Sequence, residues 1–422
     1  MAARITSRRA TIVATGSELV RGDRHDRNGP FLASSLLRLG IDPARITIVG
    51  DDAADLEQAL REGLDDDLLV VSGGLGPTHD DRTIELLARA AGVGLHTDED
   101  LAAQIEDISR RVATRLNRPY ADFEHGVRKQ ATIPEGALVV GLAGTAPAVV
   151  LKAEGTVAVA LPGPPRELQA LWPRVLETDP MRRLLERAHV PERRVLRFYG
   201  ASESEVAQAL AAAGGEGDGV DVTICARDFE IHVDLFVQPG AEARADELEV
   251  GLASRHLFSR EETGTAELVL SLLRERGLRL ATAESCTGGL VAARLTDVPG
   301  ASDVFAGSII AYSNEVKAAE LGVPEEVLRD HGAVSAETAA AMAEGARARL
   351  GVDVAVSVTG IAGPDGGTDE KPVGLVYLHA SGPMGERRRR FDFPGDRATI
   401  RGRATVAALH LVRALVTDSL QT

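Results

Sequence analysis

The feature that most constrains this fold is a regular alternation of short β-rich runs and helical stretches in the first part of the chain. The runs ATIVATG, RITIVGDD and DLLVVSGGLG are separated by NGPFLASSLLRLG and ADLEQALREGL. This alternation is typical of a parallel sheet whose strands are joined by crossover helices. The sequence therefore predicts an α/β domain, in which ligands bind beyond the carboxyl ends of the strands.

Four predicted strand ends in this region carry glycine or proline turns, and three of them carry carboxylates. The segments are GSEL at 16–19, GDD at 50–52, GGLGPTHDD at 73–81 and PGPP at 162–165. Glycines in GGLGPTHDD let the backbone approach a ligand and expose its N–H groups. The glycines that can approach a ligand in this way are Gly73, Gly74 and Gly76, and Thr78 adds a hydroxyl.

The carboxylates near these strand ends have two interpretations. Asp80 and Asp81 are expected to open the helix DDRTIELLARAAG, where an acidic side chain is first of all a good cap. Several carboxylates converging on one sheet edge instead make an oxygen-rich site suited to Mg²⁺ or a similar divalent ion that bridges phosphates. We favour the metal interpretation, with these predicted ligands: Asp80, Asp81, Glu18 and Asp51.

Two further regions follow, which differ in their pattern of predicted strands and helices. Residues 180–262 contain the strand-like RRVLRFYG and VDVTICARDFEIHVDLFVQ, with a helix between them that opens on a capping box of Ser202 and Glu205. This pattern predicts a small α+β unit. From about Thr263 the sequence returns to α/β alternation, with the helix TAELVLSLLRERG, the strand LRLATAES and the strand VDVAVSVTG.

The segment AESCTGG places a serine beside a cysteine where a predicted strand gives way to a helix. Ser285 at that position could be a helix cap, or it could be a nucleophile beside N–H groups that favour an anion. Cys286 could be an activated thiolate or a small core residue. Because adjacent residues leaving a strand point in opposite directions, only one of the two faces a pocket, and we favour Ser285.

Other strand ends in the third region add polar side chains to Ser285. Tyr312 ends a predicted strand, Lys317 lies on the first turns of the next helix, and Thr359 ends another strand before a glycine-rich loop. A buried Lys317 of lowered pKa could take the Ser285 proton in amide hydrolysis. The competing interpretation makes Lys317 a solvated helix residue, Tyr312 a core aromatic and Thr359 a turn residue. Sequence spacing alone favours this interpretation, because the residues are far apart in the chain and only a fold brings them together.

Composition excludes several classes of protein. The chain has 422 residues and a net charge of −16, which argues against broad binding to nucleic acids or anionic membranes. Two cysteines cannot build a disulfide framework or a zinc finger, which suits a cytoplasmic protein. The amino terminus lacks the features of a signal peptide, and no stretch is long and uninterrupted enough to span a membrane.

The first region also carries a resemblance. TGSELVRG, RNGPFLASSLLRLG, GDD, SGGLGPTHDDRT and LPGPPREL together resemble the amino-terminal domain of the CinA (competence/damage-inducible protein) family, which is similar to the molybdopterin-binding fold. In that family the domain is associated with metal-dependent hydrolysis of ADP-ribose to AMP and ribose 5-phosphate. The resemblance implies that the GGLGPTHDD loop holds the pyrophosphate and its metal. The family often has Asp-Thr-Asn before the first helix, where this chain reads Asp26-Arg27-Asn28.

The third region resembles the carboxy-terminal domain of the same family. Its motif series is AESCTGG, YSNEVK, HGAVS, VTGIAGPDGG, KPVG and a closing GDR-x-x-IR. The family domain deamidates nicotinamide mononucleotide to nicotinate mononucleotide and ammonia, and no cofactor is expected for it. The resemblance implies a catalytic set of Ser285, Tyr312, Lys317 and Thr359. It also implies these substrate-binding residues: Thr287, Gly288, Gly360, Arg397 and Arg401.

Together these likenesses imply two three-layer α/β domains joined by a small α+β, KH-like domain. Residues 1–179 would form the molybdopterin-binding-like ADP-ribose pyrophosphatase domain, 180–262 the KH-like domain, and 263–422 the nicotinamide mononucleotide deamidase domain. A cytoplasmic homodimer acting on these two small nucleotides is expected, with no nucleic-acid or membrane partner. The alternative is a non-catalytic nucleotide- or molybdopterin-binding protein that serves as a competence or DNA-repair partner. The intact Ser/Tyr/Lys set favours the enzyme.

Overall fold

The computed structural model describes residues 8–417, which divide into two units between Pro191 and Glu192. Residues 1–7, part of the segment for which no signal peptide is predicted, lie outside the described residues, as do 418–422. The first unit extends past the predicted boundary at 179, because Met181 and Leu184 pack into its core. Each unit is considered below by itself.

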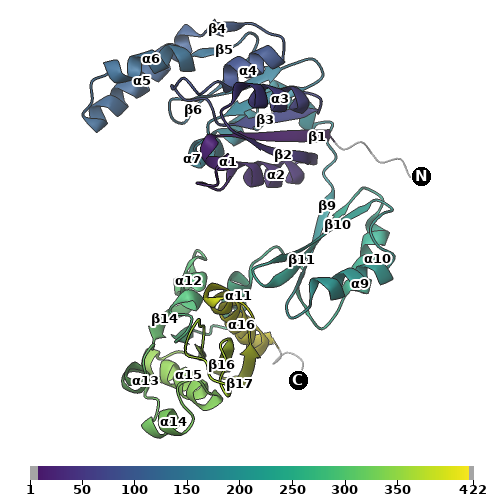
Figure 1. Cartoon of the computed structure of the whole chain (residues 1–422). Helices are drawn as coiled ribbons and strands as arrows, with labels where there is room; N and C mark the ends of the chain where they lie inside the picture. Colours follow the sequence, from purple (N-terminus) through teal and green to yellow (C-terminus); the bar gives the residue numbers. More distant parts are fainter. Residues whose placement is uncertain (1–7, 418–422) are drawn as a thin grey trace. The chain divides into compact units, whose positions relative to one another are not determined.

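The first unit is built on a six-stranded sheet of order β2-β1-β3-β8-β7-β6 (Figure 1). Strands β2, β1, β3 and β8 run parallel to one another. Strand β7 runs antiparallel to both of its neighbours, β8 and β6. The sequences LLVVS and VAVAL of β3 and β8 are buried throughout, as expected for central strands covered on both faces. A separate small sheet pairs β4 with β5. The strand bounds are β1 (Arg8–Thr15), β2 (Ile41–Val49), β3 (Leu68–Ser72), β4 (Leu95–Thr97), β5 (Thr132–Pro134), β6 (Leu138–Leu142), β7 (Pro147–Lys152) and β8 (Val157–Leu161).

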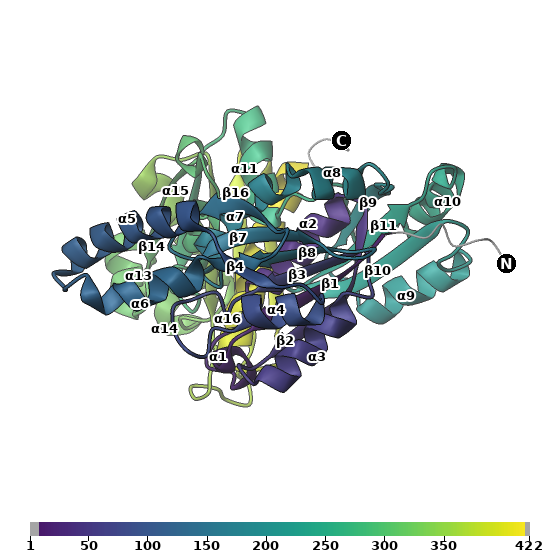
Figure 2. The ribbon, with the colours of Figure 1, turned by 90° about the horizontal axis from the view of Figure 1, so that it is seen from above.

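Helices cover both faces of this sheet and give three layers. One apolar cluster joins the sheet to α3, α4 and α5, and a second joins its other face to α2, α7 and α8. Figure 2 shows α5 and α6 side by side as a helical pair. The helix bounds are α1 (Ser17–Val20), α2 (Asn28–Arg38), α3 (Ala53–Gly63), α4 (Thr83–Ala90), α5 (Glu99–Leu116), α6 (Ala121–Gln130), α7 (Pro165–Leu176) and α8 (Asp179–Leu185).

The helix that follows the glycine-rich loop begins later than the sequence predicts. Asp80 and Asp81 do not open it, because α4 starts at Thr83 and its N-cap residue, Arg82, makes no side-chain cap. The carboxylate of Asp81 instead accepts the backbone N–H of Thr78 at 2.9 Å. Both acidic side chains therefore belong to the loop itself.

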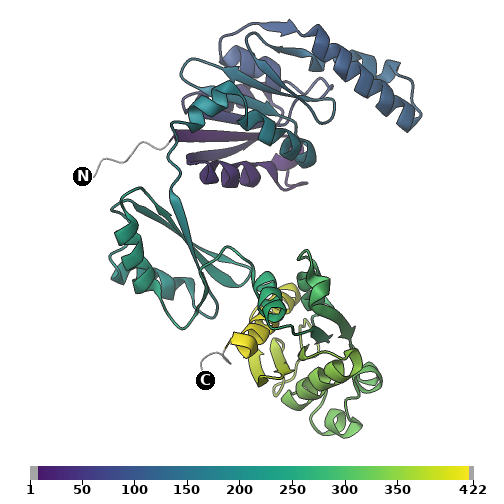
Figure 3. The ribbon, with the colours of Figure 1, turned by 180° about the vertical axis from the view of Figure 1, so that it is seen from behind.

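The middle domain, from β9 to β12, has a four-stranded antiparallel sheet of order β10-β11-β9-β12. Helices α9 and α10 pack on one face of it (Figure 3). The predicted capping box is confirmed, because Ser202 and Glu205 each bond to the other's backbone N–H at the start of α9. The element bounds are β9 (Glu192–Phe198), α9 (Glu203–Ala212), β10 (Val220–Arg227), β11 (Glu230–Val237), α10 (Glu242–Leu252) and β12 (Leu257–Ser259).

The third domain, from α11 onwards, has a five-stranded sheet of order β14-β13-β15-β16-β17. Strands β14, β13 and β15 run parallel to one another. Strand β16 runs antiparallel to both of its neighbours, β15 and β17. The element bounds are α11 (Thr265–Glu275), β13 (Leu280–Glu284), α12 (Leu290–Thr296), a 3₁₀ helix (Ala301–Asp303), β14 (Phe305–Ile310), α13 (Asn314–Leu321), α14 (Glu325–Asp330), α15 (Ala336–Leu350), β15 (Val354–Gly360), β16 (Leu375–Gly382), β17 (Gly385–Asp392) and α16 (Arg397–Thr417).

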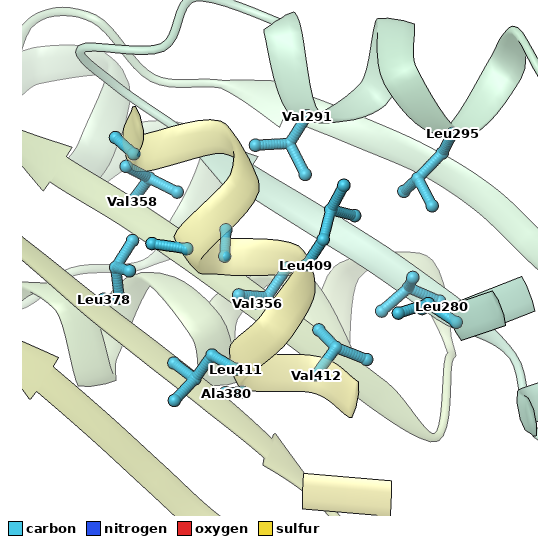
Figure 4. Packing of buried hydrophobic residues seen from close by; sticks show 14 of the residues in the cluster. Leu280, Val291, Leu295, Val356, Val358, Leu378, Ala380, Leu409, Leu411 and Val412 are labelled. Carbon is cyan, nitrogen blue, oxygen red and sulfur yellow. The ribbon is translucent and has the colours of Figure 1, made fainter. Parts of the chain in front are cut away.

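This third domain is also three-layered, so the predicted α/β class is confirmed for both larger domains. Helices α11, α12 and α16 cover one face of its sheet, and α13 and α15 cover the other. Figure 4 shows Leu409 and Val412 of α16 beside Val291 of α12 and Val356 of the sheet. Among residues 8–417, no helix is both long and apolar enough to cross a membrane.

A glycine within α15 sets the distance between α15 and α13, the helix of Lys317. A Cβ on Gly345 would overlap the carbonyl oxygen of Leu321 at the end of α13. Gly345→Ala should therefore destabilise the third domain by about 1–3 kcal/mol, the usual effect of overpacking. Urea denaturation followed by circular dichroism measures this change. Fluorescence of the single tryptophan, Trp172 in the first unit, should report an unchanged transition.

The control for this substitution is Gly264→Ala. Gly264 lies before α11 and has no atom within 4 Å of an added Cβ. It should change the free energy of unfolding by no more than about 0.5 kcal/mol, like most surface substitutions. Equal effects of the two substitutions would contradict the close packing of α15 on α13.

Candidate functional site

The AESCTGG segment forms a tight turn between strand β13 and helix α12. The backbone N–H of Ser285 still bonds to Val358 O of the neighbouring strand at 2.9 Å. The chain then turns through Gly288 and Gly289, both with left-handed φ angles of 60° and 95°. Ser285 is only 7% exposed, so the turn places its hydroxyl in a nearly enclosed position.

The side chain that meets this hydroxyl is Lys317 from α13. Its Nζ donates to Ser285 Oγ at 2.9 Å and to the carbonyl oxygen of Ala311 at 2.9 Å. Lys317 is 1% exposed, and burial is the main cause that lowers the pKa of its amine. Within residues 8–417 no carboxylate is paired with it. The structure therefore brings together two of the predicted residues, with the amine in hydrogen-bond reach of the hydroxyl.

A buried carboxylate that sequence reasoning missed anchors the turn. Glu284, the last residue of β13, is fully buried and accepts three backbone N–H groups from the start of α12, at 2.8–3.1 Å. These groups have no partners within the helix, and a carboxylate is favoured at that end of the helix dipole. The sequence signal that could have predicted this contact is an acidic residue located between a strand and the start of a helix.

Cys286 lies on the opposite side of the turn from the hydroxyl. It is 5% exposed and is part of the hydrophobic core of the third domain. Burial raises the pKa of its thiol to about 12. A thiol in this position stays protonated at neutral pH, so the serine is the better nucleophile of the pair.

Two arginines from the start of α16 tie other segments to this turn. Arg397 donates to the hydroxyl oxygen of Tyr312 at 2.9 Å and to the carbonyl oxygen of Gly363 at 2.7 Å. Arg401 donates to the carbonyl oxygens of Cys286 and Thr287, at 3.1 Å and 2.8 Å. Tyr312 is 62% exposed, so its partner Arg397 lies toward solvent. Arg401 instead braces the turn at residues 285–289, named the nucleophile turn below after its candidate nucleophile Ser285.

The remaining predicted residues of this site differ in how they are engaged. Thr359 is buried, and its hydroxyl donates to Ala333 O at 2.6 Å rather than to Ser285 or Lys317. The hydroxyl of Thr287 is fully buried without a hydrogen-bond partner. A Cβ on Gly288 would lie 3.3 Å from the Arg401 guanidinium, and one on Gly360 would lie 2.7 Å from the Leu375 carbonyl. Two residues after Ser285, the structure thus places a buried hydroxyl that makes no hydrogen bond with the described residues.

The glycine-rich loop of the first unit is a second candidate site. Gly73 and Gly74 have left-handed φ angles of 107° and 64°, and side chains there would collide with Thr15 and Thr83. A Cβ on Gly76 would collide with the carboxylate of Asp81. The loop thus needs glycine at positions 73 and 74, whereas a side chain at position 76 would displace the Asp81 carboxylate.

Thr78 organises the carboxylates of this loop. Its hydroxyl lies within hydrogen-bond distance of Asp80 and, at 2.5 Å, of Asp81. The hydrogen bond from Thr78 is the main cause that lowers the pKa of Asp80, so this carboxylate is ionised at neutral pH. Thr78 therefore holds the two carboxyl side chains side by side in the loop.

The four predicted metal ligands do not form one group. Among the described residues, no three His, Cys, Asp or Glu side chains are arranged to hold a metal ion. Asp51 instead accepts the N–H and the hydroxyl of Ser17. Asp80 and Asp81 alone still fit a divalent ion, because Mg²⁺ commonly takes one or two carboxylates and completes its shell with water and substrate phosphates.

Three polar residues around the loop were not among the predicted site residues. Lys129 of α6 donates to the Thr78 carbonyl, and Gln130 donates to the Leu75 carbonyl at 3.0 Å. Asn28 donates to Ser72 Oγ and to Gly163 O, while its own side-chain oxygen is buried without a partner. A cavity of about 350 Å³ lies between the loop and α6, lined in part by Gly74, Asp81 and Lys129.

Known proteins match the chain over both of these regions. The family described as "CinA C-terminal domain" matches residues 262–416, and the one described as "Probable molybdopterin binding domain" matches residues 11–182. The CinA-like protein of Mycolicibacterium paratuberculosis (strain ATCC BAA-968 / K-10) is 43% identical over 435 residues, which cover 98% of this chain and 99% of that protein. The CinA-like protein of Mycobacterium tuberculosis (strain ATCC 25177 / H37Ra) is 44% identical over 96% of this chain and 97% of its own length.

A solved structure matches part of the chain. The competence/damage inducible protein CihA from Agrobacterium tumefaciens is 42% identical, with a TM-score of 0.35. The match covers 36% of this chain and 93% of that one.

The anchoring role of Glu284 can be tested by stability. Glu284→Gln keeps the size of the side chain and one acceptor oxygen, but its N–H₂ must face at least one of the three N–H donors, because they are shared between both carboxylate oxygens. It should therefore cost about 1–3 kcal/mol, as for an unsatisfied buried group. Urea denaturation of the third domain measures the loss. The control is Glu267→Gln, an exposed acid in the first turn of α11, which should cost less than about 1 kcal/mol. A Glu284→Gln variant as stable as the control would contradict the anchor.

Proposed function

Because the chain belongs to the CinA family, we propose that it is a hydrolase with two separate centres. The third domain deamidates nicotinamide mononucleotide to nicotinate mononucleotide and ammonia. The first unit hydrolyses ADP-ribose to AMP and ribose 5-phosphate with a divalent metal ion. One observation supports the first activity above all others, the hydrogen bond between the buried Lys317 amine and the Ser285 hydroxyl. The choice of these two substrates rests on the family resemblance.

In the proposed reaction Lys317 acts as the general base. Its neutral amine accepts the Ser285 proton while Ser285 Oγ attacks the carbonyl carbon of the substrate carboxamide. The oxyanion that forms lies at the turn before α12, where we assign the backbone N–H of Thr287 to stabilise it. Burial favours this role because it lowers the pKa of the Lys317 amine.

The same residues complete the turnover. The protonated Lys317 returns its proton to the departing nitrogen, which leaves as ammonia, and an acyl ester remains on Ser285. A water molecule then attacks this ester, gives a proton to Lys317, and releases the carboxylic acid as the proton returns to Ser285 Oγ. The net reaction consumes one water and yields the acid and ammonia.

The two arginines have different proposed roles, one in shaping the turn and one in binding the substrate. Arg401 is committed to the carbonyl oxygens of the nucleophile turn, so we assign it to shaping that turn. Arg397 lies beside the exposed Tyr312 and keeps further N–H groups beyond its two hydrogen bonds. We therefore assign the substrate phosphate to Arg397, since a guanidinium suits that anion.

The first unit has the parts that a pyrophosphate site needs. The glycine-rich loop gives close backbone access, Lys129 supplies positive charge, and the cavity beside them takes part of a nucleotide. A divalent ion held by Asp80 and Asp81 would neutralise the pyrophosphate and lower the pKa of a bound water. The orphan side-chain oxygen of Asn28 is a further acceptor, available to a ligand hydroxyl at the same sheet edge.

Ser285 and Lys317 should behave as one catalytic unit. Ser285→Ala and Lys317→Met should each lower kcat for nicotinamide mononucleotide deamidation at least about 10³-fold, because each removes the nucleophile or its activation. The double variant should be no slower than either single one. Ammonia release measures the rates, and Lys317→Met should fold, because methionine removes a buried amine at similar length.

Cys286→Ala is the matched control for this pair. It should retain most of the activity, since the thiol faces the core. Full activity in a folded Ser285→Ala or Lys317→Met variant would refute the mechanism. A folded but inactive Cys286→Ala variant would move the nucleophile to the cysteine.

The centre in the first unit should depend on metal and on Asp81. Asp81→Asn keeps an oxygen for the Thr78 N–H but loses the charge, so AMP formation from ADP-ribose should fall at least about tenfold at limiting Mg²⁺ and recover in part at high Mg²⁺. Chelator should abolish this activity in the wild type. Deamidation by the same protein should be unchanged in both cases.

The control for Asp81 is Asp55→Asn, an exposed acid in the first turn of α3. It should leave both reactions unchanged. ADP-ribose turnover without metal, or an Asp81→Asn variant equal to the wild type, would reduce the first unit to a binding module. Chelator-sensitive deamidation would contradict the serine mechanism.

A further inference from the structure

The hairpin of β10 and β11 in the middle domain ends in an unusual turn. Arg227 pairs with Glu230, which leaves Asp228 and Phe229 as a two-residue loop. Both have left-handed φ angles, of 52° and 63°. Such loops normally use Asn-Gly or Asp-Gly, because a bulky side chain is strained there. A phenylalanine in this conformation persists only where its surroundings hold it.

What holds the turn is a pair of helices of the third domain. Asp228 forms an ion pair with Arg294 of α12 at 2.9 Å. The ring of Phe229 lies so close to Gly402 of α16 that a Cβ on this glycine would be 2.7 Å from a ring carbon. The guanidinium of Arg403 lies 5.4 Å from the centre of the same ring. Gly402 is in the interior of a long helix, where glycine is unfavourable, and the approach of the ring explains it.

A buried cluster fixes the base of the hairpin to the same helix. Glu230, at the start of β11, lies 2.7 Å from His410 Nε2 of α16 and accepts the hydroxyl of Thr265 of α11. His410 also stacks on Tyr199 of the middle domain, with ring centres 3.7 Å apart. Glu230 and His410 are both buried. The Asp228–Phe229 tip is therefore held on α12 and α16 by the buried contacts of the next residue, Glu230.

The two helices that the tip touches are those that frame the nucleophile turn. Helix α12 begins directly after this turn, and its first N–H groups are held by Glu284. Arg401, next to Gly402, holds the carbonyl oxygens of Cys286 and Thr287. Any shift of α16 against α12 would move Arg401 relative to the turn. Arg397 has separate hydrogen-bond partners, Tyr312 and Gly363, so such a shift would move it less.

We infer that the Asp228–Phe229 tip is a positioning element for the amide-hydrolysing centre, through which the middle domain sets the fit of Arg401 on the nucleophile turn. This inference rests on the proposed deamidase activity for its kinetic consequences. It assigns Phe229, Gly402 and Arg294 as positioning residues, none of which touches the substrate. It also gives the middle domain a role in catalysis beyond joining its neighbours.

Kinetics of three variants test the inference in the full chain. Phe229→Gly removes the ring and suits the left-handed backbone, so it should fold while kcat for nicotinamide mononucleotide falls about tenfold, a loss that small misplacements near a reacting group produce. KM should change less than about threefold, because Arg397 keeps its own anchors. Gly402→Ala should lower kcat similarly, since its methyl group collides with the ring.

The combination of the two changes is diagnostic. In the Phe229→Gly background the methyl group of Gly402→Ala has room, so the double variant should be no slower than Phe229→Gly alone. Independent structural damage would instead multiply the two losses. The control is Thr223→Ala, an exposed change on β10 away from the tip, which should leave kcat and KM unaltered.

A second readout does not require the proposed activity. In a Cys225→Ser background the buried Cys286 is the only thiol, and its rate of modification by a small disulfide reagent reports how often the turn opens. Phe229→Gly should raise this rate several-fold, and Gly402→Ala should do the same if the first variant fails to fold. Absence of deamidation in the wild type would sink the proposed function alone. Unchanged Cys286 reactivity in a folded variant would overturn the inference, whatever the kinetics.

Discussion

The third domain depends on one interaction, the hydrogen bond from a nearly inaccessible lysine amine to a serine hydroxyl. Burying an amine without a carboxylate partner is unfavourable, and the protein meets this cost by favouring the neutral form. A neutral amine is what a general base requires. The carbonyl oxygen of Ala311 accepts a second hydrogen bond from Lys317, so the amine is held in place without a counter-charge that would keep it protonated.

The sheet supplies the geometry for this contact. Glu284 pairs with Ile310 on one side and with Val358 on the other. Ser285 and Ala311, which follow β13 and β14, therefore lie at the same level of the sheet as Thr359 near the end of β15. Parallel strands bring their carboxyl ends to one edge, which joins residues distant in sequence. Both candidate sites of the chain follow this rule, but they use opposite electrostatics. The first unit has the carboxylates of Asp80 and Asp81 in a largely exposed loop, whereas the third domain has the buried amine of Lys317.

Much of this arrangement could be predicted from sequence, and the exceptions have physical reasons. The β/α alternation and the Ser202 cap follow from local patterns. The strand-end rule places Ser285 at a sheet edge, but its pairing with Lys317 was expected from the family resemblance, because sequence spacing alone favours a solvated lysine. The roles of Lys129 and Gln130 do not, because α6 packs against the glycine-rich loop only in three dimensions. Asp80 and Asp81 were expected to open a helix, but Thr78 draws both into the loop. The wider carboxylate cluster was expected because strand ends converge, yet Asp51 turns to Ser17.

The central claim is that Lys317 makes Ser285 nucleophilic, and it can be measured without assuming any substrate. A small fluorophosphonate reacts with activated serines, and peptide mass spectrometry locates the adduct. The account predicts labelling at Ser285 in the wild type, at a rate that rises with pH as Lys317 loses its proton. Labelling should be at least about 10²-fold slower in Lys317→Met, the usual loss when a general base is removed. Equal rates in the two proteins, or an adduct on Cys286 instead, would contradict it.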